Sequence, residues 1–360
     1  MNKRKFINQI EPLITKKDAD AVHNYLLTGG WVTEHQVTRT FENLIKEEVN
    51  RNYASAVPNG TIAIYLALIA SGVKKGDKVA VPNLTMIATI NAVLWAEAEP
   101  ILVEVNNSLC MSFQHLREIK GLNTVIYVPL NGRTEDGLEI EKWCKKNNII
   151  LIEDSAHALG SEYKLDKKCG NLGDVSIFSF TPHKIITTGQ GGMILTNNKK
   201  INTEINKIKT FNRKKDKLDW HEDFGLNFKF TDLQASLGIS QFNSLNKHIE
   251  NKRKLNKTYK KINNPNFEIG EFQENELPWF FDLYSKSKPK LKKLSKILTE
   301  KGIETRNLYP ALSKQKYLKN FRKTNLEYSE NIFDKVLWLP SSVNLRLKDQ
   351  REIVEIINEN

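Results

Sequence analysis

Short aliphatic runs alternate with longer amphipathic segments between residues 55 and 200 of the chain. The short runs are typical of buried strands, and the longer segments between them are typical of helices. Their alternation predicts a doubly wound α/β layer with a mostly parallel sheet, whose strand ends gather the loops that form binding sites. The predicted strands are KVAVP, PILVEV, TVIYVPL, IILIED, VSIFSF and GGMILT, and the predicted helices are TIAIYLALIASG, which Gly72 ends, MIATINAVLWAEA and GLEIEKWCKKNN.

The segments that flank this layer carry a helical pattern. Residues 40–49 place their apolar side chains on one face, and residues 231–262 form one long helical stretch that begins with a Thr231/Asp232 cap signal. From about residue 250 the composition shifts toward Lys and Asn, and a smaller α+β pattern follows. It consists of a strand at 278–285, a helix at 291–302 that Gly302 ends, and a terminal helix at 349–358.

The length of the chain, 360 residues, is more than one domain usually contains. Together with the change of pattern, it predicts two domains. We expect a large α/β domain over residues 1–248 and a small C-terminal α+β domain over residues 249–360. The N-terminal segment is able to pack on the small domain.

Composition argues against a membrane span, a disulfide framework and a metal site. No segment approaches the roughly 20 apolar residues that span a bilayer, and the start MNKRKFINQI has charges without an apolar leader core. We therefore expect a cytoplasmic globular protein with no membrane partner. The cysteines, Cys110, Cys144 and Cys169, lack any CxxC pair, so we expect neither a disulfide framework nor a metal site.

The formal net charge of +12 is compatible with a nucleic acid, a membrane surface or an anionic small molecule as partner. Most of the excess lies in the Lys- and Asn-rich last third, for example in NKHIENKRKLNKTYKKINN. That region has no zinc-finger spacing and no interleaved aromatic residues. The pattern favours a solvated basic surface and no nucleic-acid partner.

One lysine stands out against this basic background. From Val175 to Asn198 the chain contains a single formal charge, Lys184, set among hydroxyls, glycines and aliphatic residues. A lysine without neighbouring charges in an apolar setting has a lowered pKa, and its neutral amine can act as a nucleophile or form a Schiff base. On its own, Lys184 favours the interpretation as a lysine on a surface loop.

Two further features change that balance. Asp154 ends a predicted buried strand, where its carboxylate must face a cation, such as a protonated pyridine nitrogen, or cap a helix. Gly60 and Thr61 precede a predicted helix, a position that suits a phosphate. A Schiff-base lysine, a carboxylate and a phosphate cup are together what pyridoxal 5'-phosphate requires. The sequence therefore predicts a pyridoxal phosphate enzyme.

Five segments of the chain, in order, carry a resemblance to a known family: TGGWVTEHQVTRTFE, VPNGTIAIYLALIASGVKKGDKVAVPNLTMIATINAVLWAEAEPILVEV, LIEDSAHALGSEY, GDVSIFSFTPHKIITTGQGGMILTN and FGLNFKFTDLQASLGISQF. Through them the chain resembles the DegT/DnrJ/EryC1/StrS family of nucleotide-sugar aminotransferases. The resemblance implies the pyridoxal phosphate-dependent fold type I, with a mostly parallel seven-stranded sheet flanked by helices, and a homodimer with shared active sites.

The resemblance also assigns roles to residues. Lys184 holds the cofactor and later moves a proton as general acid and base. In addition, the resemblance implies that Asp154 pairs with the pyridine nitrogen, His157 lies near the phenolic oxygen, Gly60, Thr61 and Ser179 hold the phosphate, Met86 covers the ring face, Asn227 reaches the phosphate of the neighbouring subunit, and Trp31, Arg306 and Tyr309 bind substrate.

The implied reaction moves an amino group from L-glutamate to a nucleotide-linked keto sugar. The stretch TTGQGGM is similar to the pattern of members that act at C4, with Gln190 in place of Glu. We therefore expect a 4-keto-6-deoxyhexose substrate and a 4-amino-4,6-dideoxy sugar nucleotide of the perosamine or viosamine type, for polysaccharide biosynthesis.

Other functions stay open. One is a C3 aminotransferase of the same family, and another is a sugar 3-dehydratase, in which a histidine replaces the lysine; here His183 lies one position away from Lys184. A cysteine desulfurase would use Cys169. A regulator that binds nucleic acid without turnover is the alternative from a different class.

Overall fold

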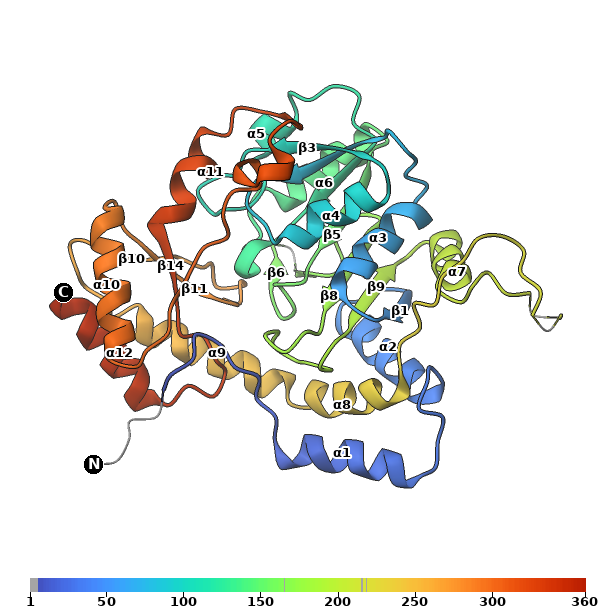
Figure 1. The fold of residues 1–360 in the computed structure, drawn as a ribbon, viewed down its shortest axis with the longest axis horizontal. Helices are drawn as coiled ribbons and strands as arrows, with labels where there is room; N and C mark the ends of the chain where they lie inside the picture. Colours follow the sequence, from blue (N-terminus) through green and yellow to red (C-terminus); the bar gives the residue numbers. More distant parts are fainter. Residues whose placement is uncertain (1–5, 165, 215, 218) are drawn as a thin grey trace.

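The computed structural model describes residues 6–164, 166–214, 216–217 and 219–360, so most of the charged start lies outside the described residues. A mostly parallel sheet runs through the larger part of the molecule (Figure 1) in the order β1-β9-β8-β5-β4-β2-β3-β13. Only β9 runs antiparallel to both of its neighbours. The strands are β1 (Tyr53–Val57), β2 (Lys78–Pro82), β3 (Glu99–Val103), β4 (Thr124–Tyr127), β5 (Ile150–Asp154), β8 (Val175–Ser179), β9 (Gly192–Thr196) and β13 (Arg322–Lys323).

This sheet confirms the predicted α/β class and contains every strand predicted between residues 55 and 200. The hydrophobic pattern did not reveal β1, because its sequence YASAV consists largely of small residues. It also did not reveal β13, which adds an eighth strand beside β3 and consists of two charged residues. Neither segment carries the aliphatic run by which strands are recognised.

Helices cover both faces of the sheet, which explains why its strands read as continuous apolar runs. In β2, Val79 and Val81 belong to the apolar cluster on one face of the sheet, whereas Ala80 between them belongs to the cluster on the opposite face. This alternation follows from the two-residue period of a strand. The helices are α3 (Gly60–Ala70), α4 (Ile87–Trp95) and α7 (Lys199–Ile208) on one face, and α5 (Phe113–Leu116), α6 (Gly137–Lys146) and α2 (Gln36–Glu48) on the other.

The prediction of one continuous helix over residues 231–262 is wrong. The structure has two helices, α8 (Asp232–Phe242) and α9 (Leu245–Tyr259), separated by Asn243 and Ser244. Both are poor helix formers that compete for backbone hydrogen bonds. The cap signal is confirmed, because the Thr231 side chain accepts a hydrogen bond from the Gln234 amide at 3.1 Å. Figure 1 shows α8 and α9 end to end beneath the sheet, with α1 (Lys16–Leu27) alongside α8.

The last third of the chain forms a second, antiparallel sheet in the order β10-β11-β14-β12. Its apolar cluster packs against α9, α10 and α12. The strand predicted at 278–285 begins only at Phe281, because Pro278, Trp279 and Phe280 lead into the site described below. The elements are β10 (Glu268–Ile269), β11 (Phe281–Tyr284), β12 (Arg306–Asn307), β14 (Val336–Leu339), α10 (Lys288–Glu300), α11 (Glu327–Ile332) and α12 (Leu347–Glu359); a small hairpin, β6 (Glu162–Tyr163) and β7 (Lys167–Lys168), belongs to neither sheet.

The N-terminal segment lies across this second sheet before it reaches α1. Ile7 forms a parallel bridge with Ile303, and the Gln9 carbonyl accepts a hydrogen bond from the Ser341 amide at 2.7 Å. Helix α9 spans residues 248 and 249, so the proposed domain boundary falls inside a helix and stays a prediction. Across the part of the chain that is described, no helix has the length and apolar character needed to cross a membrane.

Candidate active site

Lys184 lies in a turn after β8, and its backbone amide donates a hydrogen bond to the Thr181 carbonyl at 3.0 Å. Its amine lies 4.0 Å from the centre of the Trp279 indole ring. Burial lowers the pKa of Lys184 to about 7; the charge of Asp154 opposes this shift and that of Arg306 adds to it. A large fraction of the amine is therefore neutral near pH 7, which is the form that attacks a carbonyl carbon.

Asp154 is buried at the carboxyl end of β5. Its carboxylate accepts hydrogen bonds from the Thr89 hydroxyl at 2.8 Å and from the Ala156 amide at 3.3 Å. Burial raises the pKa of Asp154, while these hydrogen bonds and the Lys184 charge oppose the shift. The residues after Asp154 form turns instead of a helix, so the alternative role as a helix cap is wrong.

His157 is buried three residues after Asp154, in the first turn that follows β5. Its ring packs on Trp279 with centroids 3.8 Å apart, and the Tyr309 ring is 6.2 Å away. Burial lowers the pKa of His157 well below its ordinary value, and the charges of Lys184 and Arg306 act in the same direction. The Nδ1 atom is buried without a hydrogen-bond partner among the described residues. Such an atom is open to a polar atom of a ligand.

The predicted phosphate cup is formed where α3 begins. Gly60 lies directly against Ser179 at the end of β8: a Cβ atom on Gly60 would be 3.1 Å from the Ser179 Cβ and 3.3 Å from its Oγ. The amides of Gly60 and Thr61 have no acceptor among the described residues, whereas the next amide, that of Ile62, is capped by the Asn59 side chain at 2.9 Å. Free amides at the positive end of a helix dipole, beside a hydroxyl, suit a phosphate.

Arg306 and Tyr309, predicted to bind substrate, lie at the edge of this cluster. The Arg306 guanidinium is 5.5 Å from the centre of the Tyr309 ring and 5.6 Å from that of Trp338. Arg306 is exposed, and its charge acts on both Lys184 and His157. Met86 is 43% exposed at the start of α4, where its sulfur accepts a hydrogen bond from the Ala88 amide at 3.0 Å. Its place over the cofactor ring stays a prediction.

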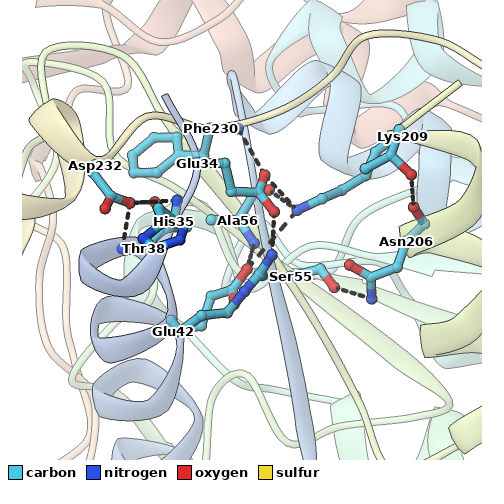
Figure 2. Close-up of polar contacts among 12 residues, drawn as sticks. Glu34, His35, Thr38, Glu42, Ser55, Ala56, Asn206, Lys209, Phe230 and Asp232 are labelled. Carbon is cyan, nitrogen blue, oxygen red and sulfur yellow. Dashed lines mark hydrogen bonds and ion pairs between the residues drawn. The ribbon is translucent and has the colours of Figure 1, made fainter. Parts of the chain in front are cut away.

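Trp31 and Asn227 are not brought to Lys184 in the single chain. Trp31 is 70% exposed, Asn227 is exposed, and neither lines the two cavities beside Lys184. Glu34, three residues after Trp31, and Phe230, three residues after Asn227, belong to a buried polar cluster around Lys209 (Figure 2). In that cluster the Lys209 amine pairs with Glu34 at 3.0 Å, and Glu34 also accepts a hydrogen bond from the Phe230 amide at 3.2 Å.

Four residues of the site were missed by sequence reasoning: Thr89, Trp279, His248 and Lys252. A buried carboxylate needs hydrogen-bond donors, which predicts a partner such as Thr89 for Asp154 but does not say where in the sequence it lies. Trp279 was read as part of a strand. His248 and Lys252 belong to the basic run predicted to be a solvated surface, and for these two that prediction is wrong, because both are buried.

The residues present fit pyridoxal phosphate. Lys184 offers a neutral amine, Asp154 a buried carboxylate, His157 an unpartnered ring nitrogen, and Gly60 free amides. By contrast, burial raises the pKa of Cys169 well above its ordinary value, so this thiol is a poor nucleophile, which argues against a desulfurase.

Comparisons with known proteins agree with this geometry. The sequence matches the DegT/DnrJ/EryC1/StrS aminotransferase family over residues 12–358. GDP-perosamine synthase from Escherichia coli O157:H7 is 32% identical over 99% of this chain and 98% of its own. The UDP-4-amino-4,6-dideoxy-N-acetyl-β-L-altrosamine transaminase of Campylobacter jejuni is 30% identical over 96% and 94% of the two chains. A Streptococcus pneumoniae protein solved in its PLP form has a TM-score of 0.89 at 21% identity, over 99% and 98% of the chains.

The chain therefore belongs to the DegT/DnrJ/EryC1/StrS aminotransferase family. The predicted aminotransferase class and fold type I are confirmed, and the family is one of pyridoxal phosphate-dependent enzymes. The roles given to individual residues rest on the geometry described above and stay proposals.

Proposed function

We propose that this enzyme moves an amino group from L-glutamate to C4 of a nucleotide-linked 4-keto-6-deoxyhexose, giving a 4-amino-4,6-dideoxy sugar nucleotide. The observation that carries the proposal is the amine of Lys184, whose pKa burial lowers to about 7 within the electrostatic reach of Asp154. The names of the two relatives, one a GDP-perosamine synthase and one a 4-amino-4,6-dideoxy sugar transaminase, support the C4 position.

Lys184, Asp154 and His157 would hold the ring of the cofactor, and Gly60, Thr61 and Ser179 its phosphate. When bound, pyridoxal phosphate supplies an electron sink for the bond that is broken next to the nitrogen. The buried Asp154 carboxylate would keep the pyridine nitrogen protonated, and Thr89 fixes the orientation of that carboxylate. The neutral His157 would donate or accept one hydrogen bond through its free Nδ1.

Lys184 would act as general acid and base in both halves of the reaction. A group works best in this role when its pKa is close to the working pH, since it can then both accept and release a proton. The Lys184 pKa of about 7 meets this condition. Arg306, an exposed cation beside Lys184, supports the binding of an anionic substrate, which both glutamate and a diphosphosugar are.

A homodimer with shared sites is also part of the proposal. Asn227 and Trp31 are exposed, and large apolar side chains nearby in the sequence are exposed as well, with Trp220 at 61% and Phe224 at 73%. Exposed aromatic residues of this kind favour a protein interface.

Complementation tests the shared site. Lys184→Ala and Asn227→Ala chains should each be inactive alone, and a refolded mixture should recover about a quarter of the wild-type activity, because half the dimers are hybrids with one intact site. A mixture as inactive as its parts would argue against the contribution of Asn227 across the interface.

The function itself is tested by mass spectrometry and NMR of products formed from glutamate and a panel of GDP-, UDP- and dTDP-linked 4-keto-6-deoxy sugars. The expected product gains an amine at C4. An amine at C3 would support the C3 alternative instead. DNA binding with steep salt dependence, together with no visible absorbance from bound cofactor, would support the nucleic-acid-binding regulator. The cytoplasmic location stays a prediction.

A further inference from the structure

Two buried polar side chains of helix α9, His248 and Lys252, face the segment that carries Lys184. They are four residues apart, so they lie on the same side of the helix, one turn from each other. His248 is 3% exposed and Lys252 is 1% exposed. Neither has a role in the function proposed above.

His248 fixes the backbone on one side of Lys184. Its Nδ1 atom is 2.8 Å from the carbonyl oxygen of Ile185, the next residue in the chain. Because a carbonyl oxygen only accepts, Nδ1 must carry the proton and donate it. Burial lowers the pKa of His248, although the Ile185 carbonyl and the charge of Asp18 oppose this shift, so burial favours the neutral ring.

Lys252 fixes the polypeptide at Trp279. Its amine donates hydrogen bonds to the carbonyl oxygens of Trp279 and, at 2.6 Å, of Ser341, and it lies 5.5 Å from the centre of the Phe281 ring. Among the described residues no carboxylate pairs with it, and burial lowers its pKa to about 7. Burying an amine without a counterion costs free energy. The hydrogen bonds of Lys252 to two separate segments offset part of that cost and join the segments to α9.

Trp279 links Lys252 to the backbone on the other side of Lys184. Its indole N–H donates to the carbonyl oxygen of His183, the residue before Lys184, at 2.8 Å. The face of the same ring lies 4.0 Å from the Lys184 amine, and the ring packs on His157. The carbonyl groups on both sides of Lys184 are thus held by hydrogen bonds that lead back to α9.

We propose that His248 and Lys252 are positioning residues that aim the amine of Lys184, His248 through the Ile185 carbonyl and Lys252 through Trp279. We call His248, Lys252 and Trp279 the α9 clamp. The inference rests on the proposed function, in which Lys184 is the reacting group. Misplacement of a reacting group by about 1 Å costs up to about a hundredfold in rate. Contacts that fix the backbone on both sides of Lys184 are therefore able to control the rate of its reaction.

A purely structural role would be to join α9 to the segment beneath it. The two roles differ in what they do to Lys184. Loss of a structural contact lowers stability and leaves the amine as it was. Loss of the clamp lets the amine swing into water, where its pKa returns toward the ordinary lysine value and its aim is lost.

The test measures the reactivity of Lys184 in the cofactor-free protein. Acetic anhydride labelling over a pH series, followed by peptide mass spectrometry, gives the rate and the midpoint pH for Lys184 alone. The variants are Lys252→Met and His248→Leu. The control is Tyr259→Phe, which removes a buried hydrogen bond of 2.7 Å from the same helix to the Pro340 carbonyl without touching Trp279.

In the clamp variants the midpoint should move upward from the wild-type value of about 7, and the rate of pyridoxal phosphate capture by Lys184, followed by visible absorbance, should fall about tenfold or more. Tyr259→Phe should change neither quantity. His248→Asn should restore much of the wild-type behaviour, because its amide N–H can replace Nδ1. Trp279→Phe, a milder change that keeps the ring but lacks the donor, should give an intermediate shift even if Lys252→Met does not fold.

Midpoints and capture rates in the clamp variants equal to those of Tyr259→Phe would overturn the proposal. Failure of the proposed function has a different signature, because wild-type protein would then not be trapped by borohydride at Lys184 with pyridoxal phosphate. The labelling of Lys184 without cofactor would still report whether the clamp exists.

Discussion

Lys209 is fully buried and Lys184 is partly buried, and the two amines differ in their partners. Lys209 donates to the Ala56 carbonyl at 2.8 Å and lies between two carboxylates, Glu34 at 3.0 Å and Glu42 at 3.9 Å (Figure 2). Among the described residues Lys184 has no direct ion pair; its amine faces an indole ring. The carboxylates hold Lys209 in an ion-paired position, whereas burial without a direct ion pair favours the neutral, reactive amine of Lys184.

The largest effect should come from the reactive lysine. Lys184→Ala should lower kcat by about 10⁴-fold or more, because it removes both the nucleophile and the general acid and base. The protein should stay folded, since no ion pair is broken. Turnover assays with circular dichroism check both statements. A variant that still forms a borohydride-reducible adduct with pyridoxal phosphate would contradict the assignment.

The next largest effect should be the loss of protein stability when the ion-paired Lys209 is replaced. Among the described residues, Lys209→Met leaves Glu34 and Glu42 with Arg39 as their only cation, and loss of one member of a buried ionic group should lower the free energy of unfolding by about 3 kcal/mol. Lys252→Met strands no carboxylate, so only hydrogen bonds are lost and the cost should be about 1–2 kcal/mol. Urea unfolding of the two variants measures the difference. Equal losses would show that carboxylates do not distinguish these sites.

The comparison also shows what sequence reasoning could reach. Lys184 was recognisable because it is the single charge in an apolar stretch, and Asp154 because it ends an aliphatic run. Lys252 was hidden, because in NKRKLNKTYKK it is one lysine among several and only the packing of α9 shows that it points inward. Thr89 and Trp279 lie far from Lys184 in the sequence, and only the fold brings them to it.

The same limit applies to the fold. Aliphatic strands such as β5 were visible, because a sheet covered on both faces demands continuous apolar residues. The short strand β13 was not visible, because its place beside β3 depends on where the C-terminal part of the chain returns. The contribution predicted for Asn227 would require a second copy of the chain, which no local pattern describes, and it stays a prediction.

A smaller effect should appear in the pH dependence of cofactor capture. The neutral amine is the reactive form, so capture by Lys184 should rise with pH and be half-maximal at about pH 7. Asp154 stabilises the charged amine, so Asp154→Asn should move this midpoint to lower pH. Thr89→Val removes the hydrogen bonds of the Thr89 hydroxyl to Asp154 and to Thr85 but leaves the carboxylate in place, so it should move the midpoint less, in the same direction. Stopped-flow absorbance measures the midpoints, and an upward shift in Asp154→Asn would contradict the proposed coupling.

The smallest effect tests the phosphate cup. A methyl group on Gly60 would approach the Ser179 Cβ to 3.1 Å, closer than ordinary contact, so Gly60→Ala should displace one wall of the cup and weaken pyridoxal phosphate binding about tenfold. Alanine is a better helix former than glycine, so α3 itself should not be destabilised, and the melting temperature of the cofactor-free protein controls for this. Inorganic phosphate should compete with pyridoxal phosphate more strongly for the wild-type site than for the site of the variant. Unchanged affinity for both ligands would place the phosphate away from Gly60, and the role of the adjacent free amide of Thr61 would then have to be abandoned as well.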